Sequence, residues 1–199
     1  MVVPVKLLAR AKTRLAPFGD AARAELALAF AADVVAAVLR CDAVARVLVV
    51  TDDVRAASAL RQPGSRVVRD LPGAGLNAAL RHGARVLREQ DPALGVASLA
   101  SDLPALDAAD LGAALLRVQA RAFVPDSAGE GTTLLAAAPG WRLQPSYGPG
   151  SRARHLASGA VELSAPAALR LDVDTPDDLA AALRLGVGPH TAAVAAVLA

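Results

Sequence analysis

The segment at 46–51, Arg-Val-Leu-Val-Val-Thr, constrains the fold more than any other stretch of the sequence. Its four central residues are all apolar, and a strand that is apolar throughout is covered on both faces. Similar short apolar runs recur along the chain and alternate with longer segments of helical periodicity. This alternation predicts an α/β fold with a mainly parallel sheet and helices on both faces. A length of 199 residues without an internal repeat fits one domain over 1–199.

Start signals support several of the predicted helices. Asp20 and Asp107 stand where N-caps are expected, and Thr175 precedes Pro176 and two acidic residues. We expect strands at 2–5, 46–51, 66–69, 95–100, 122–125, 132–137, 161–163 and 169–173, and helices at 21–40, 53–61, 76–89, 108–118, 151–157 and 176–185.

The ligand of an open parallel sheet lies beyond the carboxyl ends of its strands. Four segments are expected at that edge: 6–14, 52–53, 75–77 at the end of the glycine loop 70–77, and 101–102. Cations, an amide and carboxylates should therefore converge at one edge of the sheet.

The basic segment after the first strand is unusual in its lysines. Only two of the 21 Lys and Arg residues are lysines, and both, Lys6 and Lys12, lie in this segment beside Arg14. Lysine offers a compact charge to phosphate oxygens, and arginine adds a planar fork that grips two of them. The segment is therefore interpreted as a polyphosphate site, with a solvated basic loop as the alternative.

Carboxylates also follow predicted strands. Asp102 ends one apolar strand before Leu103, and Asp172 and Asp174 stand near the end of a later one. Carboxylates in such places suit Mg²⁺, which takes one or two of them and keeps phosphate and water ligands. The alternatives are a turn-forming role for Asp102 and a helix-capping role for Asp174.

Two glycine-containing segments, 129–133 and 148–151, flank the strand at 132–137. They offer backbone amides and hydroxyls without bulky side chains, and together they suggest a pocket for a small phosphorylated acid. Ordinary turns are the alternative for both. His155 follows the second segment and is expected at the surface, as is His82, with contact to an anionic substrate as the alternative for His155. The three histidines have no metal-ligand spacing.

Composition excludes several classes of function. A net charge of +2, without a basic and aromatic stripe, argues against a nucleic-acid partner. Cys41 is the single cysteine, so neither an internal disulfide nor a thiolate zinc site is expected, and a reducing compartment fits. No P-loop or nucleophile-elbow motif is present. Without a secretion signal or a membrane-spanning run, we expect a cytoplasmic protein.

Seven short motifs, in this order, resemble one known family. They are Pro4-Val5-Lys6, Ala11-Lys12-Thr13-Arg14-Leu15, Gly75-Leu76-Asn77-Ala78-Ala79-Leu80, Asp102-Leu103-Pro104, Gly131-Thr132-Thr133-Leu134-Leu135, Tyr147-Gly148-Pro149-Gly150-Ser151 and Asp172-Val173-Asp174-Thr175-Pro176. The chain resembles the phosphoenolpyruvate or 2-phospho-L-lactate guanylyltransferases of coenzyme F420 biosynthesis. The resemblance implies a single Rossmann-like nucleotidyltransferase domain, similar to that of the molybdenum-cofactor guanylyltransferases.

The resemblance also implies a role for each motif. Lys6, Lys12 and Arg14 would hold the phosphates of GTP, with Asn77 near the nucleotide. Asp102, Asp174 and Asp172 would hold Mg²⁺. Thr133, Gly148 and Ser151 match the positions that bind the phospho-acid. The sequence departs from the family at Ser101, where glycine is usual before Asp-Leu-Pro, and this side chain puts the activity in question.

The implied reaction moves GMP from GTP onto the phosphate of a small phospho-acid and releases pyrophosphate. Phosphoenolpyruvate is favoured as the acceptor, with 2-phospho-L-lactate next. The acceptor phosphate is already anionic, so catalysis needs positioning and charge neutralisation rather than a general base. Alternatives are another acceptor, such as a sugar phosphate or a molybdopterin, and a catalytically silent GTP-binding protein. The sequence does not decide the oligomeric state.

Overall fold

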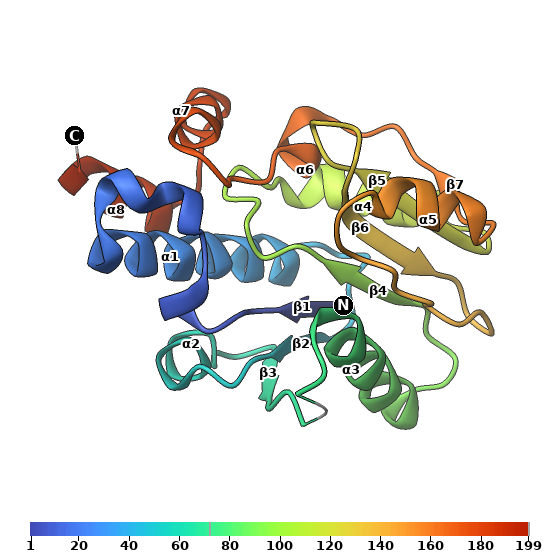
Figure 1. The fold of residues 1–199 in the computed structure, drawn as a ribbon. Helices are drawn as coiled ribbons and strands as arrows, with labels where there is room; N and C mark the ends of the chain where they lie inside the picture. The colour runs from blue at the N-terminus through green and yellow to red at the C-terminus, as the bar shows by residue number, and fades with distance from the viewer. Residues whose placement is uncertain (72, 199) are drawn as a thin grey trace.

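A computed structural model describes residues 1–71 and 73–198 of the chain. One seven-stranded sheet, in the order β3-β2-β1-β4-β6-β5-β7, forms its centre (Figure 1). Strand β6 runs antiparallel to both of its neighbours, whereas the other neighbouring pairs are parallel. The strands are β1 (Val2–Pro4), β2 (Val47–Val50), β3 (Ser65–Val68), β4 (Val96–Leu99), β5 (Arg121–Pro125), β6 (Thr132–Ala137) and β7 (Val161–Glu162). The predicted α/β fold with a mainly parallel sheet is confirmed.

Helices cover both faces of this sheet (Figure 1). Alternate strand residues point to opposite faces, so Val47 and Val49 pack with α1 and α4, whereas Leu48 and Val50 pack with α3. The helices are α1 (Asp20–Leu39), α2 (Val54–Ala59), α3 (Leu76–Gln90), α4 (Ala108–Leu116), α5 (Ser151–Ala157), α6 (Ala167–Arg170), α7 (Pro176–Leu185) and α8 (Pro189–Leu198), with 3₁₀ turns η1 (Leu8–Arg10) and η2 (Thr13–Phe18). None of the described helices combines the length and the apolar character needed to cross a membrane.

Two of the expected helix caps are confirmed. Oδ1 of Asp107 accepts the amides of Ala109 and Asp110 at 2.8 and 3.2 Å at the start of α4. Thr175 and Asp178 form a reciprocal capping box at the start of α7. The third expected cap is wrong, because Gly19 is the N-cap of α1 and Asp20 is its first residue.

The predicted strand at 169–173 is also wrong. Its alternating apolar residues belong instead to the short helix α6 and to an irregular segment that follows it. Leu169 packs under α4 with the main core, whereas Val173 packs with α1 and α7. Alternation here thus reflects burial in two separate clusters rather than the two faces of a strand.

Helix α8 has no counterpart among the predicted elements. It packs along α1 (Figure 1), and its first amides are capped by a residue far away in the sequence. The buried carboxylate of Asp33 accepts the amides of His190 and Thr191 at 3.0 and 2.8 Å. Pro189 is the one local start signal, and no local acceptor accompanies it.

Candidate active site

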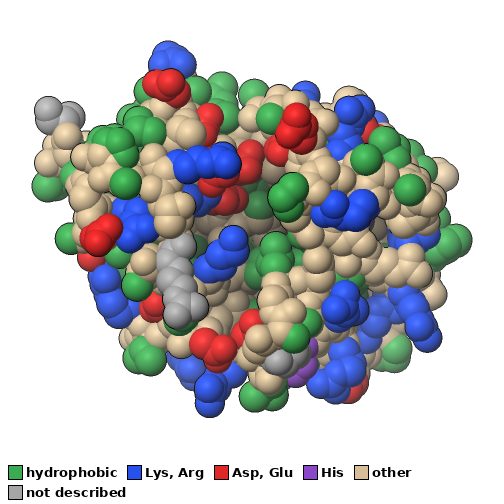
Figure 2. Space-filling view, viewed as in Figure 1, with side chains coloured by type: hydrophobic (Ala, Val, Ile, Leu, Met, Phe, Trp, Pro, Cys, Tyr) green, Lys and Arg blue, Asp and Glu red, His purple; other side chains and the backbone are tan. Residues whose placement is uncertain are grey.

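A cavity of about 350 Å³ opens beyond the carboxyl ends of β1 and β4. Acidic and basic side chains gather around this hollow (Figure 2). The edge is the one at which the sequence places the ligand of a parallel sheet. Its lining includes Pro4, Val5, Lys6, Leu8, Ala11, Lys12, Thr13, Arg14, Ala27, Leu76, Ser98, Leu99, Ala100, Ser101, Asp102, Thr132, Tyr147, Asp172 and Asp174.

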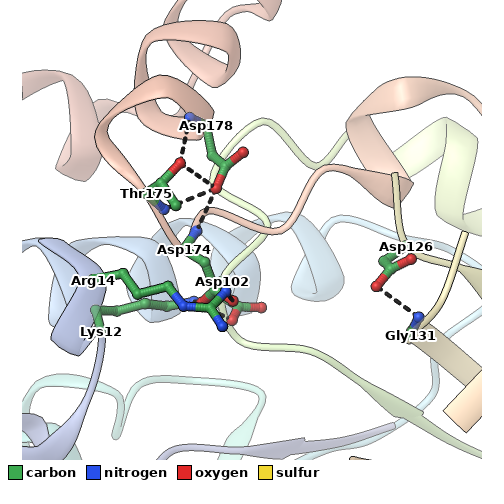
Figure 3. A network of polar contacts seen from close by, with 8 residues as sticks. All are labelled: Lys12, Arg14, Asp102, Asp126, Gly131, Asp174, Thr175 and Asp178. Carbon is green, nitrogen blue, oxygen red and sulfur yellow. Dashed lines mark hydrogen bonds and ion pairs between the residues drawn. The ribbon is translucent and has the colours of Figure 1, made fainter. Parts of the chain in front are cut away.

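Lys12 lies at the centre of the polar network in this cavity (Figure 3). Its ammonium donates to Oδ2 of Asp102 and, at 2.7 Å, to Oδ1 of Asp174. Its backbone has φ 53° and ψ 47°, a left-handed conformation that costs a side-chain-bearing residue on the order of 1 kcal/mol. The surrounding contacts therefore hold Lys12 in a strained backbone that aims its side chain at the two carboxylates.

The two carboxylates are brought to Lys12 by backbone contacts between distant segments. The amide of Val173 donates to the carbonyl of Asp102 at 3.0 Å, which joins the end of β4 to the segment before α7. The amide of Asp174 donates to Asp178 within the capping box, at 3.1 Å (Figure 3). The cap that starts α7 therefore also fixes the position of Asp174.

Charge and burial shift the ionisation of this cluster. Burial acts to lower the pKa of the Lys12 ammonium, but the charges of Asp102 and Asp174 outweigh it and raise that pKa. Burial acts to raise the pKa of Asp174, and Lys12, Arg14 and Lys6 outweigh it and lower that pKa. Burial, followed by the charges of Asp102 and Asp174, raises the pKa of Asp172 to about 7. The cluster thus holds more negative charge than Lys12 neutralises.

The remaining two predicted phosphate ligands line the same cavity and are exposed. Arg14 is 74% exposed and lies 3.9 Å from Oδ2 of Asp174, and Lys6 is exposed near the mouth of the cavity. Ser101, the departure from the family pattern, lies in the lining as well. It is not among the described residues with positive φ, so a serine fits this backbone without strain.

The segment 52–53 follows the carboxyl end of β2 as expected, but its carboxylates are bound within the chain. Oδ1 of Asp53 accepts the amide of Ala56 at 3.0 Å and caps α2, while its Oδ2 accepts the amide of Leu8 at 2.9 Å. Asp52 pairs with Arg69 at the surface at 3.2 Å. The expectation that these carboxylates join the site is therefore wrong, because the chain uses them to fix the backbone beside it.

Asn77 also contacts the chain rather than the open cavity. Its Oδ1 accepts the amide of Tyr147 at 2.7 Å, and its Nδ2 donates to the carbonyl of the same residue at 3.0 Å. Its neighbour Leu76 lines the cavity. The glycine loop before it includes Pro72, which lies outside the described residues.

The predicted phospho-acid residues lie around the start of β6. The hydroxyl of Thr133 donates to the carbonyl of Leu169 at 2.7 Å, and that of Ser151 donates to Oγ1 of Thr132 at 3.2 Å. Gly148 has φ +120°, which favours glycine, and lies beside Arg154. Thr132, which sequence reasoning did not single out from its neighbour, is the threonine in the lining of the cavity.

A register shift explains why Thr132 rather than Thr133 faces this side. The pairing of β5 with β6 slips between Val124 and Pro125, next to the two threonines. Simple alternation from Leu135 would place Thr133 on the face of the sheet that α3 covers. The shift instead turns Thr133 to α6 and places Thr132 against His155.

The turn before β6 is held by Asp126. Its Oδ2 accepts the amide of Gly131 at 2.7 Å (Figure 3), and its Oδ1 accepts that of Glu130 at 2.9 Å. A Cβ at Gly131 would overlap the same Oδ2, so any other residue there would displace the Asp126 carboxylate. Sequence reasoning missed Asp126, although aspartate and glycine are both residues typical of turns.

The expectation that His155 lies at the surface is wrong. Its side chain is 0% exposed and packs between the rings of Phe123 and Tyr147, at centroid distances of 5.6 and 5.4 Å. Burial, followed by the charges of Arg154 and Arg121, lowers its pKa to about 4. The imidazole is therefore neutral at physiological pH.

Within the described residues, no three or more His, Cys, Asp or Glu side chains are grouped as metal ligands. One observation nevertheless fits a cation. Oδ1 of Asp102 is buried and has no hydrogen-bond partner in the described part of the chain. Such an oxygen, next to two further carboxylates of which Asp172 is half-protonated near neutral pH, is suited to a hard divalent cation.

Comparisons with known proteins agree on one family. The family model described as CofC-like guanylyl transferase matches residues 1–194. A Streptomyces coelicolor protein named phosphoenolpyruvate guanylyltransferase is 59% identical over 203 residues, covering 100% of this chain and 96% of that protein. A protein of the same name from Thermomonospora curvata is 56% identical over 200 residues, covering 98% of this chain and 88% of that protein.

Solved structures resemble the chain in fold. A nucleotidyl transferase from Methanothermobacter thermautotroptrophicus has a TM-score of 0.57 at 23% identity, and the match covers 93% of this chain and 97% of that one. The CMP:2-keto-3-deoxy-manno-octonic acid synthetase complexed with CTP has a TM-score of 0.56 at 16% identity, covering 92% and 96%. At these identities the likeness establishes the arrangement of the elements alone.

Proposed function

The chain belongs to the CofC-like guanylyl transferase family, and from that premise we propose that it moves GMP from GTP onto the phosphate of a small phospho-acid. Phosphoenolpyruvate is the first candidate acceptor and 2-phospho-L-lactate the second, in coenzyme F420 biosynthesis. The whole of 1–199 acts as one nucleotidyltransferase domain. The observation that carries this proposal is the cavity in which Lys6, Lys12 and Arg14 meet the carboxylates of Asp102 and Asp174.

The reaction is a substitution at the α-phosphorus of GTP. A phosphate oxygen of the acceptor forms a bond to that phosphorus, and the bond to the bridging oxygen of pyrophosphate breaks in line. The attacking oxygen is already anionic and carries no proton that must be removed. The described lining of the cavity contains neither histidine nor glutamate, which is consistent with a reaction that needs no such base.

The basic residues neutralise the charge that the leaving pyrophosphate gains. Lys12 has three N–H donors, of which Asp102 and Asp174 take two, so one remains for a phosphate oxygen. Exposed Lys6 and Arg14 are free to turn toward the triphosphate. Such donors stabilise the transition state more than the ground state because charge develops beside them.

We propose that Asp102 and Asp174, with Asp172 beside them, hold Mg²⁺. Two observations support this donor set: an oxygen of Asp102 has no partner in the described part of the chain, and burial followed by the neighbouring carboxylates raises the pKa of Asp172. A bound divalent cation would lower the charge on the phosphates at this end of the cavity. Asn77 is proposed to lie near the nucleotide, while its side chain holds the backbone of Tyr147 before the phospho-acid end.

Thr133, Gly148 and Ser151 are proposed to form the phospho-acid end. Since the hydroxyls of Thr133 and Ser151 are already donated within the chain, their contribution is to shape this end and to present backbone. Ser151 begins α5 directly after the two left-handed glycines Gly148 and Gly150. The amides of Ser151 and Arg152 donate to the carbonyls of Gly148 and Glu130, each at 3.0 Å, so bonds within the chain hold the shape of this turn.

Pyrophosphate release tests the proposal. GTP and Mg²⁺ are supplied with phosphoenolpyruvate, 2-phospho-L-lactate or 3-phosphoglycerate, one at a time, and CTP and ATP replace GTP as controls. We expect release with GTP and phosphoenolpyruvate at the highest kcat/KM. Release with none of the three acids, from protein that still binds GTP, would contradict the proposal and favour a silent binding protein.

A further inference from the structure

A chain of hydrogen bonds runs from a buried histidine to the wall of the cavity. The backbone amide of Ser146 donates to Nε2 of His155 at 3.0 Å. On the other side of the ring, Nδ1 of His155 lies 2.9 Å from Oγ1 of Thr132. Thr132 is part of the cavity lining, whereas His155 is completely buried behind it.

The backbone amide fixes the tautomer of the imidazole. An amide N–H can only donate, so Nε2 of His155 must be the unprotonated nitrogen. In a neutral ring the proton is then on Nδ1, and this nitrogen donates to Oγ1 of Thr132. The ring is neutral, because burial and the charges of Arg154 and Arg121 lower its pKa to about 4.

Thr132 therefore accepts two hydrogen bonds. One comes from Nδ1 of His155 at 2.9 Å, and the other from the hydroxyl of Ser151 at 3.2 Å. A hydroxyl oxygen has two acceptor positions and one proton, so both acceptor positions are filled. No acceptor for the proton of Thr132 is found in the described part of the chain, and the open space next to it is the cavity.

We propose that His155 is a positioning residue that makes the Thr132 hydroxyl an obligate hydrogen-bond donor to an anionic oxygen of the phospho-acid. The inference rests on the proposed function. The acceptor rather than GTP is its partner, because Ser151, which contacts Thr132, belongs to the phospho-acid end. The basic residues of 6–14 lie on a different strand end, after β1.

An obligate donor selects for the ligand atom in front of it. A carboxylate or phosphate oxygen accepts from Thr132, whereas an amide N–H or an ammonium group at the same place would leave two donors facing each other. Sites that hydrogen-bond a substrate group discriminate strongly against analogues that cannot complete the bond. Thr132 and His155 are thus specificity residues for the anionic end of the acceptor.

Threonine variants give the first test. Thr132→Val keeps the size of the side chain and removes the donor, together with the acceptor for His155 and Ser151, whereas Thr132→Ser keeps the hydroxyl. We expect Thr132→Val to raise the KM for phosphoenolpyruvate roughly tenfold or more, with the KM for GTP unchanged, and Thr132→Ser to stay near the wild-type value. Thr191→Val is the matched control, since this buried threonine lies in α8 and its hydroxyl has no partner among the described residues.

Histidine variants test the positioning role. His155→Leu removes the donor to Thr132, and His155→Asn restores an N–H at the place of Nδ1. We expect His155→Leu to raise the KM for phosphoenolpyruvate and His155→Asn to recover most of the loss. If His155 acts through Thr132, the double variant with Thr132→Val has the KM of Thr132→Val alone, because the two effects are not additive.

Ring nitrogen NMR of the wild-type protein gives a readout that does not depend on turnover or on the folding of a variant. We expect the Nδ1–H tautomer of His155, with Nε2 unprotonated. The Nε2–H tautomer would overturn the inference, as would a rise in the KM for GTP alone or an unchanged KM in an active Thr132→Val variant. Wild-type protein that turns over no phospho-acid would instead overturn the proposed function, and this substrate with it.

Discussion

The ammonium group of Lys12 lies 2.7 Å from Oδ1 of Asp174, although the two residues are 162 positions apart in the sequence. Asp102 accepts from the same ammonium, so Lys12 joins the ends of three separate segments. Its left-handed backbone shows that these contacts outweigh local strain. One side chain thus holds the carboxylates together and offers a charge to the cavity.

We expect Lys12→Ala to lower kcat/KM by about a hundredfold or more, because the phosphates lose a largely buried cation in the cavity wall. Pyrophosphate release with GTP and the acceptor measures this loss, and circular dichroism checks that the fold is intact. Arg55→Ala is the control, since Arg55 is exposed and pairs with Glu25 at 2.7 Å on α1. A wild-type kcat/KM in Lys12→Ala would show that Lys12 does not take part in the reaction.

Replacing Asn77 distinguishes two possible roles for this residue: holding the loop of Tyr147, or contacting the nucleotide directly. Both of its side-chain hydrogen bonds go to the backbone of Tyr147, so we expect Asn77→Ala to loosen the loop before Ser151. The KM for the phospho-acid should then rise several-fold, and more than the KM for GTP. Asn77→Asp keeps the acceptor for the Tyr147 amide and should give an intermediate value. A rise in the KM for GTP alone would support a direct nucleotide contact instead.

Helix α8 should depend on Asp33 of α1. This carboxylate is buried and accepts the amides of His190 and Thr191, which no local residue caps. We expect Asp33→Ala to lower the free energy of unfolding by about 1–2 kcal/mol, as measured by denaturant titration. Asp42→Ala, at an exposed loop position, is the control and should change it little. Equal stability of the two variants would show that packing alone holds α8.

Much of this site could be predicted because the order of strands and helices alone indicates which loops meet at one edge of the sheet. Strands that alternate with helices place their carboxyl ends at one edge, and so the segments of Lys12 and Asp102 had to meet there. Asp107 and Thr175 accept from amides two or three residues further along the chain, and such local caps can be predicted directly from a sequence. The same reasoning placed Asp53 at the edge but could not show that the chain uses its oxygens for α2 and Leu8.

The features that could not be predicted are of two kinds: which face of an element a residue occupies, and which distant residue it contacts. Alternation gives the period of β6 but not which threonine faces the cavity, and the register shift beside Pro125 exchanged Thr132 for Thr133. His155 lies on a helix of two turns, too short for its buried face to be read from the sequence. The start of α8 is capped from α1, by a residue that sequence reasoning had no reason to pair with it.

The buried imidazole of His155 should make the protein less stable in acid. Its pKa is about 4 in the folded state and 6.5 when exposed, so above pH 6.5 both states are neutral and its contribution to stability is complete. As the pH falls from 6.5 to 4, the unfolded state binds a proton that the folded state excludes, and the free energy of unfolding decreases by roughly 3 kcal/mol.

The charged groups around the ring support this sign. Arg154 of α5 and Arg121 of β5 both oppose a charge on the imidazole, and Tyr147, whose pKa is raised above its ordinary value chiefly by burial, remains neutral across this range. We expect the difference in unfolding free energy between wild type and His155→Asn to shrink between pH 7 and pH 4, when both are measured by urea titration. A difference that stays constant over this range would mean that His155 takes up its proton at the same pH in the folded and unfolded states.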